Sequence, residues 1–448
     1  MTDAPAPAGP RAARGRRLAL RGDLLDFAAA PAWGAAATDA VRFRPDHWLL
    51  IEDGAVAGVQ AQAPDAGWER VDHRGRLVLP GFVDAHVHGP QIDMIASFGA
   101  ELLDWLQAYT FPAELRHGEP AEAVAGAERF ADALLAHGTT AAVVMPTVHR
   151  ASAEALFAAA RARGMRLVTG KVLMDRNAPP GLTDDVAQAE RDCLALIERW
   201  HGRDRLAYAV TVRFAPTSTP AQLAMAGALC AADPTLYLHT HVAENRDEVR
   251  WVGELFPEAR SYLDVYARAG LLHRRSVLAH GIWLDAGDHA ALATSGAVIA
   301  HSPSSNLFLG SGLFDWRALA RRGAAVAMAS DVGAGTSLSM QRTLADAYKV
   351  QALRGQRLTA WVALHAATRG AAQALGLERE IGSFDAGCSA DVCVWDWARG
   401  AVAERRHALA QDLHEQVFAW MMLADERNLV SARVAGAERF RRGEFAVR

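Results

Sequence analysis

The hydrophobic pattern of this chain changes near Leu79. Before that point, β-rich segments at 17–27 (RLALRGDLLDF) and 47–60 (HWLLIEDGAVAGVQ) are separated by turn and loop residues, which predicts strands of a small sheet. From Leu79 onward, apolar strands alternate with long stretches rich in Ala and Leu. That alternation predicts βα units and a parallel sheet.

Eight strand segments can be read in this second region. Eight parallel strands with covering helices close naturally into a barrel. The segments are LPGFVDAHVH near 79, GTTAAVVMP near 138, RLVTGKVLM near 166, LAYAVTVRFAP near 206, LYLHTHVAE near 236, SVLAHGI near 276, AVIAHSP near 297 and AAVAMASDV near 324.

Strand-like pieces return at 390–396 and 429–443, after helical stretches around 340–377. We therefore predict an α/β protein with a TIM-like (β/α)8 catalytic barrel at 79–379. A small β-sandwich domain is expected from both chain ends, residues 16–78 and 380–448. Residues 1–15, rich in Pro, Ala and Arg, predict a mobile tail.

Composition and charge limit the class of partner. The formal net charge of -4 provides no broad positive field, so we do not expect nucleic acid to bind. No segment is apolar over the length of a bilayer, and the N-terminus lacks the apolar run of a secretory signal, so we expect no membrane association. The four cysteines form no C-x-x-C pair, which argues against a disulfide framework and favours a cytoplasmic protein.

Polar side chains stand at the ends of the predicted barrel strands, where such barrels place their chemistry. His86 and His88 are one residue apart and share a face of the first strand. On the fifth strand, His241 lies nearer the mouth of the barrel than His239 does. Glu244 follows in the loop after this strand. The last three strands end at His280, His301 and Asp331.

These positions favour a metal centre of three histidines and one aspartate over unrelated polar residues at the rim. Each residue alone could be a satisfied rim group, and Asp331 could cap a helix. Imidazole and carboxylate ligands suit zinc, with iron or manganese as alternatives. Arg213, on the inward face of the fourth strand, needs an acidic or carbonyl partner. Considered alone, it fits a structural ion pair better than a substrate contact.

The motifs PGFVDAHVHGPQ, HVAEN, LAHG and ASDVG resemble the metal-dependent amidohydrolase superfamily, specifically its mononuclear deaminases. Longer strings, among them DMIASFGAELLDWLQAYTFPAE, GKVLMDRNAP, RFAPTSTPAQL, HSPSSNLFLGSGLF and SDVGAGTSLSM, are similar to the guanine deaminase family across nearly the whole barrel. The resemblance implies hydrolysis of guanine to xanthine and ammonia, as in purine catabolism, by a zinc-dependent homodimer.

The resemblance also assigns roles to particular residues. It implies that His86, His88, His241 and Asp331 bind one metal ion, with Fe2+ or Mn2+ possible in place of Zn2+. Glu244, His280 and Asp331 would be catalytic, with Glu244 carrying the proton. Gln91, Arg213, Phe214 and His280 would contact the purine. Lys171 resembles a metal-bridging lysine of hydrolytic relatives, but it falls on the third strand, which does not fit that role.

Two other functions stay open at this stage. A related deaminase acting on a triazine, a pterin, cytosine or an adenine-like ring would use the same metal ligands. A non-catalytic binding protein on the same barrel is a different class, but it is disfavoured because no proposed ligand or proton carrier is missing.

Overall fold

The computed structural model describes residues 15–99 and 102–444, which form two compact units. Their described parts are residues 85–99, 102–131 and 142–337 in the first unit, and 15–84, 132–141 and 338–444 in the second. Apart from Gly15, the predicted tail lies outside the described residues. No helix in the described ranges is both long and apolar enough to cross a membrane.

The parallel sheet predicted from the sequence is present. Its strands follow the order β13-β12-β11-β10-β9-β7-β6-β5, and β8 pairs with β9. The strands are β5 (Phe82–His88), β6 (Thr139–Met145), β7 (Arg166–Thr169), β8 (Val172–Leu173), β9 (Leu206–Val212), β10 (Tyr237–Val242), β11 (Ser276–His280), β12 (Val298–His301) and β13 (Ala325–Met328). The predicted third strand is therefore split into β7 and β8.

Backbone hydrogen bonds join the segment after the last strand to the first. The Asp331 N–H donates to the His86 carbonyl at 3.0 Å, and the His88 N–H donates to the Val332 carbonyl at 2.8 Å. These bonds bring the two ends of the parallel sheet together. The eight-stranded barrel is thus confirmed. Strand residues that face outward are buried as well as those that face inward, because helices cover the outer face of the barrel.

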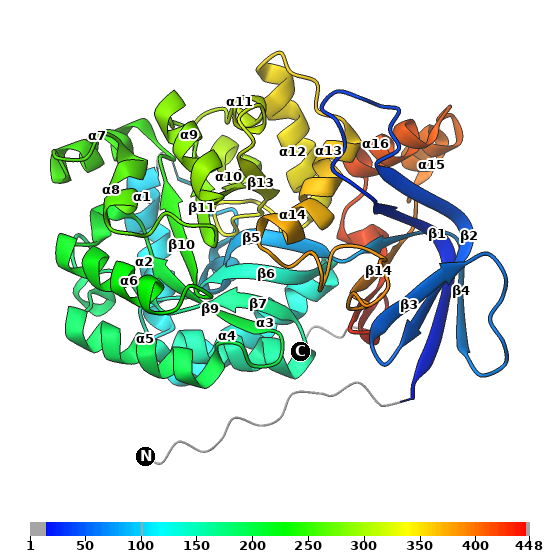
Figure 1. Ribbon diagram of the computed structural model, residues 1–448, viewed down its shortest axis with the longest axis horizontal. Helices are drawn as coiled ribbons and strands as arrows, with labels where there is room; N and C mark the ends of the chain where they lie inside the picture. The colour runs from blue at the N-terminus through cyan, green and yellow to red at the C-terminus, as the bar shows by residue number, and fades with distance from the viewer. Residues whose placement is uncertain (1–14, 100–101, 445–448) are drawn as a thin grey trace. The chain divides into compact units, whose positions relative to one another are not determined.

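Helices cover the outside of the barrel strands, as Figure 1 shows for α4, α5 and α6. α4 packs against β7, whereas α5 and α6 pack against β9. The helices between residues 89 and 337 are η1 (Gly89–Met94), α1 (Leu102–Trp105), the π-helix η2 (Leu106–Thr110), α2 (Phe111–Arg116), α3 (Pro120–Ala136), α4 (Arg150–Arg163), η3 (Pro180–Leu182), α5 (Val186–Trp200), η4 (Ala215–Thr217), α6 (Pro220–Ala232), α7 (Arg246–Leu255), α8 (Tyr262–Arg268), α9 (Ala286–Ser295), α10 (Pro303–Phe308) and α11 (Trp316–Ala320).

Both chain ends build the second sheet, as predicted. Its order is β16-β15-β14-β4-β1-β2-β3, antiparallel except where β1 pairs with β4. The strands are β1 (Arg17–Phe27), β2 (Val41–Glu52), β3 (Ala55–Gln60), β4 (Glu69–Pro80), β14 (Val392–Trp395), β15 (Leu429–Val434) and β16 (Ala437–Arg441). The remaining helices are α12 (Met340–Leu353), α13 (Ala360–Ala366), α14 (Arg369–Ala374), α15 (Ala401–Ala408), α16 (Leu413–Leu423) and η5 (Glu426–Asn428).

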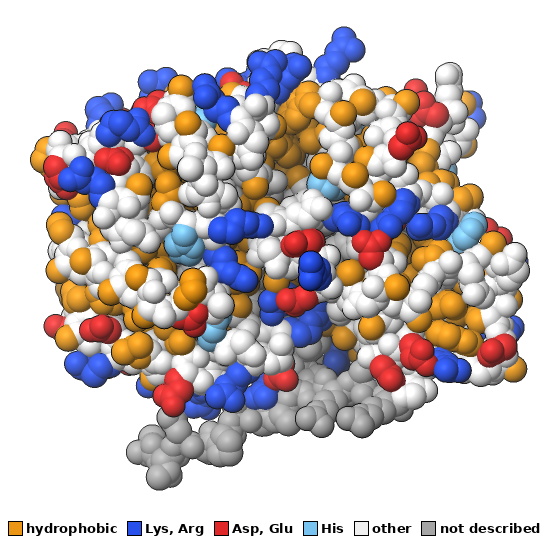
Figure 2. Space-filling view, viewed as in Figure 1, with side chains coloured by type: hydrophobic (Ala, Val, Ile, Leu, Met, Phe, Trp, Pro, Cys, Tyr) orange, Lys and Arg blue, Asp and Glu red, His pale blue; other side chains and the backbone are white. Residues whose placement is uncertain are grey.

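Charged side chains of both signs are mixed over the face drawn in Figure 2. That mixing agrees with the formal net charge of -4, because no single sign dominates the surface that is visible there.

Candidate metal centre and active site

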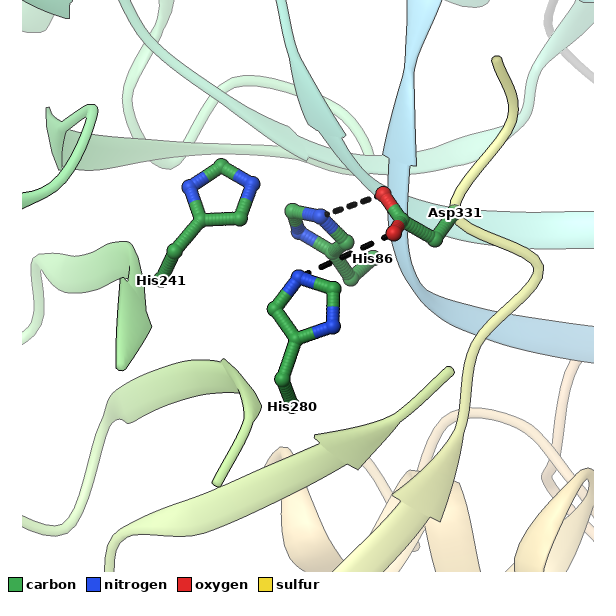
Figure 3. A group of neighbouring side chains, drawn as sticks. All are labelled: His86, His241, His280 and Asp331. Carbon is green, nitrogen blue, oxygen red and sulfur yellow. Dashed lines mark ion pairs between the residues drawn. The ribbon is translucent and has the colours of Figure 1, made fainter. Parts of the chain in front are cut away.

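Four barrel strands bring histidines and an aspartate to one place. His86 and His88 come from β5, His241 from β10 and His280 from the end of β11, while Asp331 follows β13. Figure 3 shows four of these side chains approaching one another, with Asp331 beside His86 and His280. One possible ligand atom from each of these four residues, His86, His241, His280 and Asp331, lies within 4.8 Å of the others.

His88 completes the predicted ligand set. Its Nε2 lies 3.3 Å from Asp331 Oδ1 and 3.2 Å from His241 Nε2, and His86 Nε2 lies 2.9 Å from the same Asp331 oxygen. Ligand atoms about 2 Å from one tetrahedral ion would be separated by similar distances. The structure therefore brings together all four predicted ligands, His86, His88, His241 and Asp331.

Hydrogen bonds at the far side of two rings indicate which nitrogen faces the cluster as an acceptor. His241 Nδ1 lies 2.6 Å from the Arg213 carbonyl, which only accepts, so Nδ1 carries the proton and Nε2 keeps its lone pair. His86 Nδ1 lies 2.7 Å from His239 Nε2, which can act as the acceptor. Such bonds orient the histidine ligands of metals in proteins.

Burial and the contacts between neighbouring groups together determine the charges in the cluster. It lowers the pKa of His86 to about 4, lowers that of His88, and holds that of His241 well below the ordinary value. Burial works against ionisation of Asp331, but the imidazoles of His86 and His88 outweigh it, so the pKa of Asp331 is well below its usual range. Neutral imidazoles beside a carboxylate form the donor set that a divalent cation prefers.

Glu244 lies next to this cluster without belonging to the ligand set. It is 4 % exposed, and burial raises its pKa to about 7. Its Oε2 lies 3.4 Å from His280 Nε2, and its Oε1 accepts a hydrogen bond from Ser311 Oγ at 3.2 Å. A carboxyl group with this pKa can take up and release a proton near neutral pH.

His280 is held between Asn306 and the carboxylates. Its Nδ1 lies 2.8 Å from Asn306 Oδ1, and its Nε2 lies 3.7 Å from Asp331 Oδ2. Burial opposes protonation of this ring, yet the charges of Glu244 and Asp331 give it a raised pKa. Asn306 and Ser311 were not predicted from the sequence, because they lie in the long HSPSSNLFLGSG segment that begins at the end of β12 and follow no strand-end pattern.

The predicted substrate contacts Gln91 and Arg213 share an acidic partner, Glu114, which was not predicted from the sequence. Arg213 Nη1 donates to Glu114 Oε1 at 2.6 Å, and Gln91 Nε2 donates to the same oxygen at 3.0 Å. Phe214 is 5 % exposed and packs edge-on against Trp251, with 6.2 Å between ring centroids. These contacts supply the acidic partner that a buried guanidinium requires.

Two other candidates from the sequence lie outside the cluster. His301 packs against the rings of Phe314 and Trp316, and burial lowers its pKa to about 3. Lys171 forms an ion pair with Asp184, with 2.6 Å from Nζ to Oδ1. Its ammonium group therefore has an acidic partner within the described residues.

The sequence profile of the amidohydrolase family matches residues 77–434, and the chain belongs to this family. It is 41 % identical over 424 residues to guanine deaminase of Escherichia coli, covering 93 % of this chain and 96 % of that protein. The solved structure of the E. coli guanine deaminase has a TM-score of 0.91, covering 95 % of this chain and 99 % of that one at 39 % identity. The solved structure of a guanine deaminase from C. acetobutylicum, with bound guanine in the active site, has a TM-score of 0.86. The match covers 95 % of this chain and 100 % of that one at 26 % identity.

Proposed function

We propose that this protein catalyses the hydrolytic deamination of guanine to xanthine and ammonia, a step of purine catabolism. The observation that carries this proposal is that His280 lies between Glu244 and Asp331, in a chain whose relatives named above are guanine deaminases. Gln91 and Arg213, which both contact Glu114, lie near this group, because His241 Nδ1 donates to the Arg213 carbonyl. Glu244, His280 and Asp331 would take part in proton transfer, while Gln91 and Arg213 would hold the purine.

His86, His88, His241 and Asp331 would hold the metal ion, and we propose zinc because their nitrogen and oxygen donors suit it. A divalent cation bound there would lower the pKa of water towards about 7. Asp331 would in addition orient the attacking water. We expect Glu244 to take the proton from that water and deliver it to N3 as oxygen adds to C2 of guanine.

The same carboxyl group can complete the reaction. Glu244, deprotonated after its proton passes to N3, would take the remaining proton from the hydroxyl now on C2 and pass it to the amine. The C2–N bond then breaks, the C2 carbonyl forms, and ammonia leaves while xanthine remains. His280 would hydrogen-bond the oxygen at C2 and stabilise the charge that develops there. No other proton carrier is required, because burial raises the pKa of Glu244 to about 7.

Recognition of the ring would depend on the opposite side of the site. The Arg213 guanidinium suits the O6 edge of guanine, and the Gln91 amide offers both a donor and an acceptor to another edge. Phe214 would form a wall of the pocket. We further propose a homodimer, by family resemblance, and a cytoplasmic location, which fits four cysteines that are all free and buried.

The deciding experiment is an ammonia assay on purified protein of measured metal content. Guanine should release one ammonia per xanthine formed, whereas triazine, pterin, cytosine and adenine-like rings should react far more slowly. If guanine is inert while another of these rings turns over, the proposed substrate is wrong. If none reacts although metal is bound, the proposed activity is wrong.

A further inference from the structure

Glu114 is a buried carboxylate that contacts both proposed recognition residues. It lies on α2 and is 0 % exposed. Arg213 Nη1 donates to its Oε1 at 2.6 Å and to its Oε2 at 2.8 Å, while Gln91 Nε2 donates to Oε1 at 3.0 Å. A single acidic side chain therefore joins an arginine and a glutamine that are far apart in the sequence.

These contacts fix the direction of the Gln91 amide. The Gln91 Oε1 accepts a hydrogen bond from the Gly333 N–H at 3.2 Å, so its NH2 group must face Glu114, which accepts only. Gly333 approaches closely, because a Cβ at this position would lie 2.7 Å from the Gln91 carbonyl oxygen. The amide is thus held from two sides by groups that leave it a single orientation.

The guanidinium of Arg213 is held along one side only. Its Nη1 is engaged by Glu114, and its Cζ lies 5.6 Å from the centroid of the Phe111 ring. Both bonds to Glu114 use Nη1, so Nε and Nη2 are not engaged by that carboxylate. These two donors are available to a carbonyl oxygen or ring nitrogen of a ligand.

We propose that Glu114 is a positioning residue that makes this subsite selective for an uncharged purine over an anionic one. An unpaired buried guanidinium would attract anions strongly, because charges interact over longer range where water is excluded. When the Arg213 guanidinium is paired with Glu114, the pair has no net charge, yet the guanidinium still presents N–H donors to a ligand. This inference rests on the proposed function, since it concerns the purine that Arg213 and Gln91 would hold.

The selectivity has a consequence for turnover. Guanine is uncharged at neutral pH, whereas xanthine is a weak acid that loses a proton on mild alkalinisation. A neutral subsite binds guanine through its carbonyl edge but gives the xanthine anion no additional attraction. The charge of Glu114 would therefore favour release of the product.

Calorimetric titration of the metal-loaded protein tests the proposal without relying on turnover. Xanthine and hypoxanthine are the probes, at a mildly alkaline pH where xanthine is largely an anion and hypoxanthine largely neutral. The readout is the ratio of their dissociation constants. In Glu114→Gln, which removes the charge at nearly constant shape, this ratio should shift towards xanthine by about tenfold, the size expected for one charge-assisted interaction. The KM for guanine should rise while kcat changes less.

Three further variants separate charge from structure. Glu114→Asp keeps the charge, so it should retain the wild-type ratio even if guanine binds more weakly. Glu119→Gln, an exposed position five residues along the chain, should leave both the ratio and the KM unchanged. Arg213→Met removes the cationic partner of the Glu114 carboxylate, so it should shift the ratio the other way, against xanthine.

The outcomes are distinguishable from failure of the proposed function. If the wild-type protein deaminates guanine but Glu114→Gln and Arg213→Met leave the ratio unchanged, the selectivity role is overturned while the activity stands. If Glu114→Gln does not fold, the opposite shift in Arg213→Met supports the role, and an unchanged ratio there overturns it. A protein that releases no ammonia from guanine would contradict the proposed function instead.

Discussion

His280 and Asp331 have left-handed backbone conformations, with φ of 73° and 50°. For residues other than glycine such conformations cost about 1 kcal/mol or more, and they cluster at functional sites. Here they lie where β11 and the segment after β13 turn away from the sheet. The sequence predicts that these side chains stand at strand ends, but it does not reveal this turn, because neither residue is a glycine.

Glu244→Gln should retain the metal and lose turnover by about 10²–10⁴-fold, the usual contribution of a positioned proton carrier. An amide cannot take up and return the proton, although its shape is nearly the same. Metal analysis and the ammonia assay measure the two effects separately. Glu258→Gln, an exposed position beyond α7, is the matched control and should keep the wild-type rate. Normal turnover in Glu244→Gln would remove this residue from the mechanism.

His239 provides a second prediction at the residue scale, because its Nε2 lies 2.7 Å from His86 Nδ1. We expect His239→Leu to weaken metal retention by about 10–100-fold, as losses of such supporting hydrogen bonds do. His239→Gln can still accept the His86 N–H and should lose much less. Competition with a chelator measures the affinities. Equal metal retention in the two variants would show that this hydrogen bond does not support the site.

At the scale of elements, α7 begins two residues after Glu244, and its first turn holds the Glu244 backbone. Asn245 and Glu248 form a capping box, the Glu244 N–H donates to Glu248 Oε2 at 2.9 Å, and Tyr262 Oη donates to Glu248 Oε1 at 2.7 Å. The acid that would transfer the proton is thus held by the start of a helix, a position that is better defined than a free loop.

Removing this cap should affect stability and catalysis together. Asn245→Ala is expected to lower the free energy of unfolding by about 1 kcal/mol, the usual effect of losing an N-cap side chain. We also expect a reduced kcat with unchanged metal content, because a frayed first turn of α7 would loosen the Glu248 carboxylate that holds the Glu244 N–H. Denaturant unfolding and steady-state kinetics measure these effects. Lost stability with an unchanged kcat would mean that the cap does not position Glu244.

The sequence predicted the elements that follow simple periodic patterns and missed those set by distant contacts. The eight apolar strand segments were identified because buried parallel strands read as continuous apolar runs. The break between β7 and β8 was not predicted, although Gly170 lies there. A Cβ at this position would be 2.0 Å from the Ala209 carbonyl oxygen. That close approach depends on a neighbouring strand, which no local pattern reveals.

Glu114 shows the same limit within the site. It lies on a short helix whose position no strand pattern predicts, and 99 residues separate it from Arg213. The buried guanidinium indicated that an acidic or carbonyl partner was needed but not which residue supplies it. The strand-end histidines and Asp331 were predictable because barrel topology brings strand ends together.

At the scale of the whole molecule, every residue of the candidate site between His86 and Asp331 belongs to the barrel unit. We propose 79–379 as the catalytic barrel, with 16–78 and 380–448 as the accompanying β domain. Histidines from widely separated strands converge only if the barrel closes. The proposed mechanism therefore requires that the closed barrel hold one cation at its mouth.

A crystal structure with anomalous scattering recorded at the zinc absorption edge tests this claim most directly. We predict a single peak bound by His86, His88, His241 and Asp331, with Glu244 and His280 close by but not bound. A peak held by His280 in place of His88, a second peak beside Lys171, or no peak among these side chains in an active protein would contradict the account.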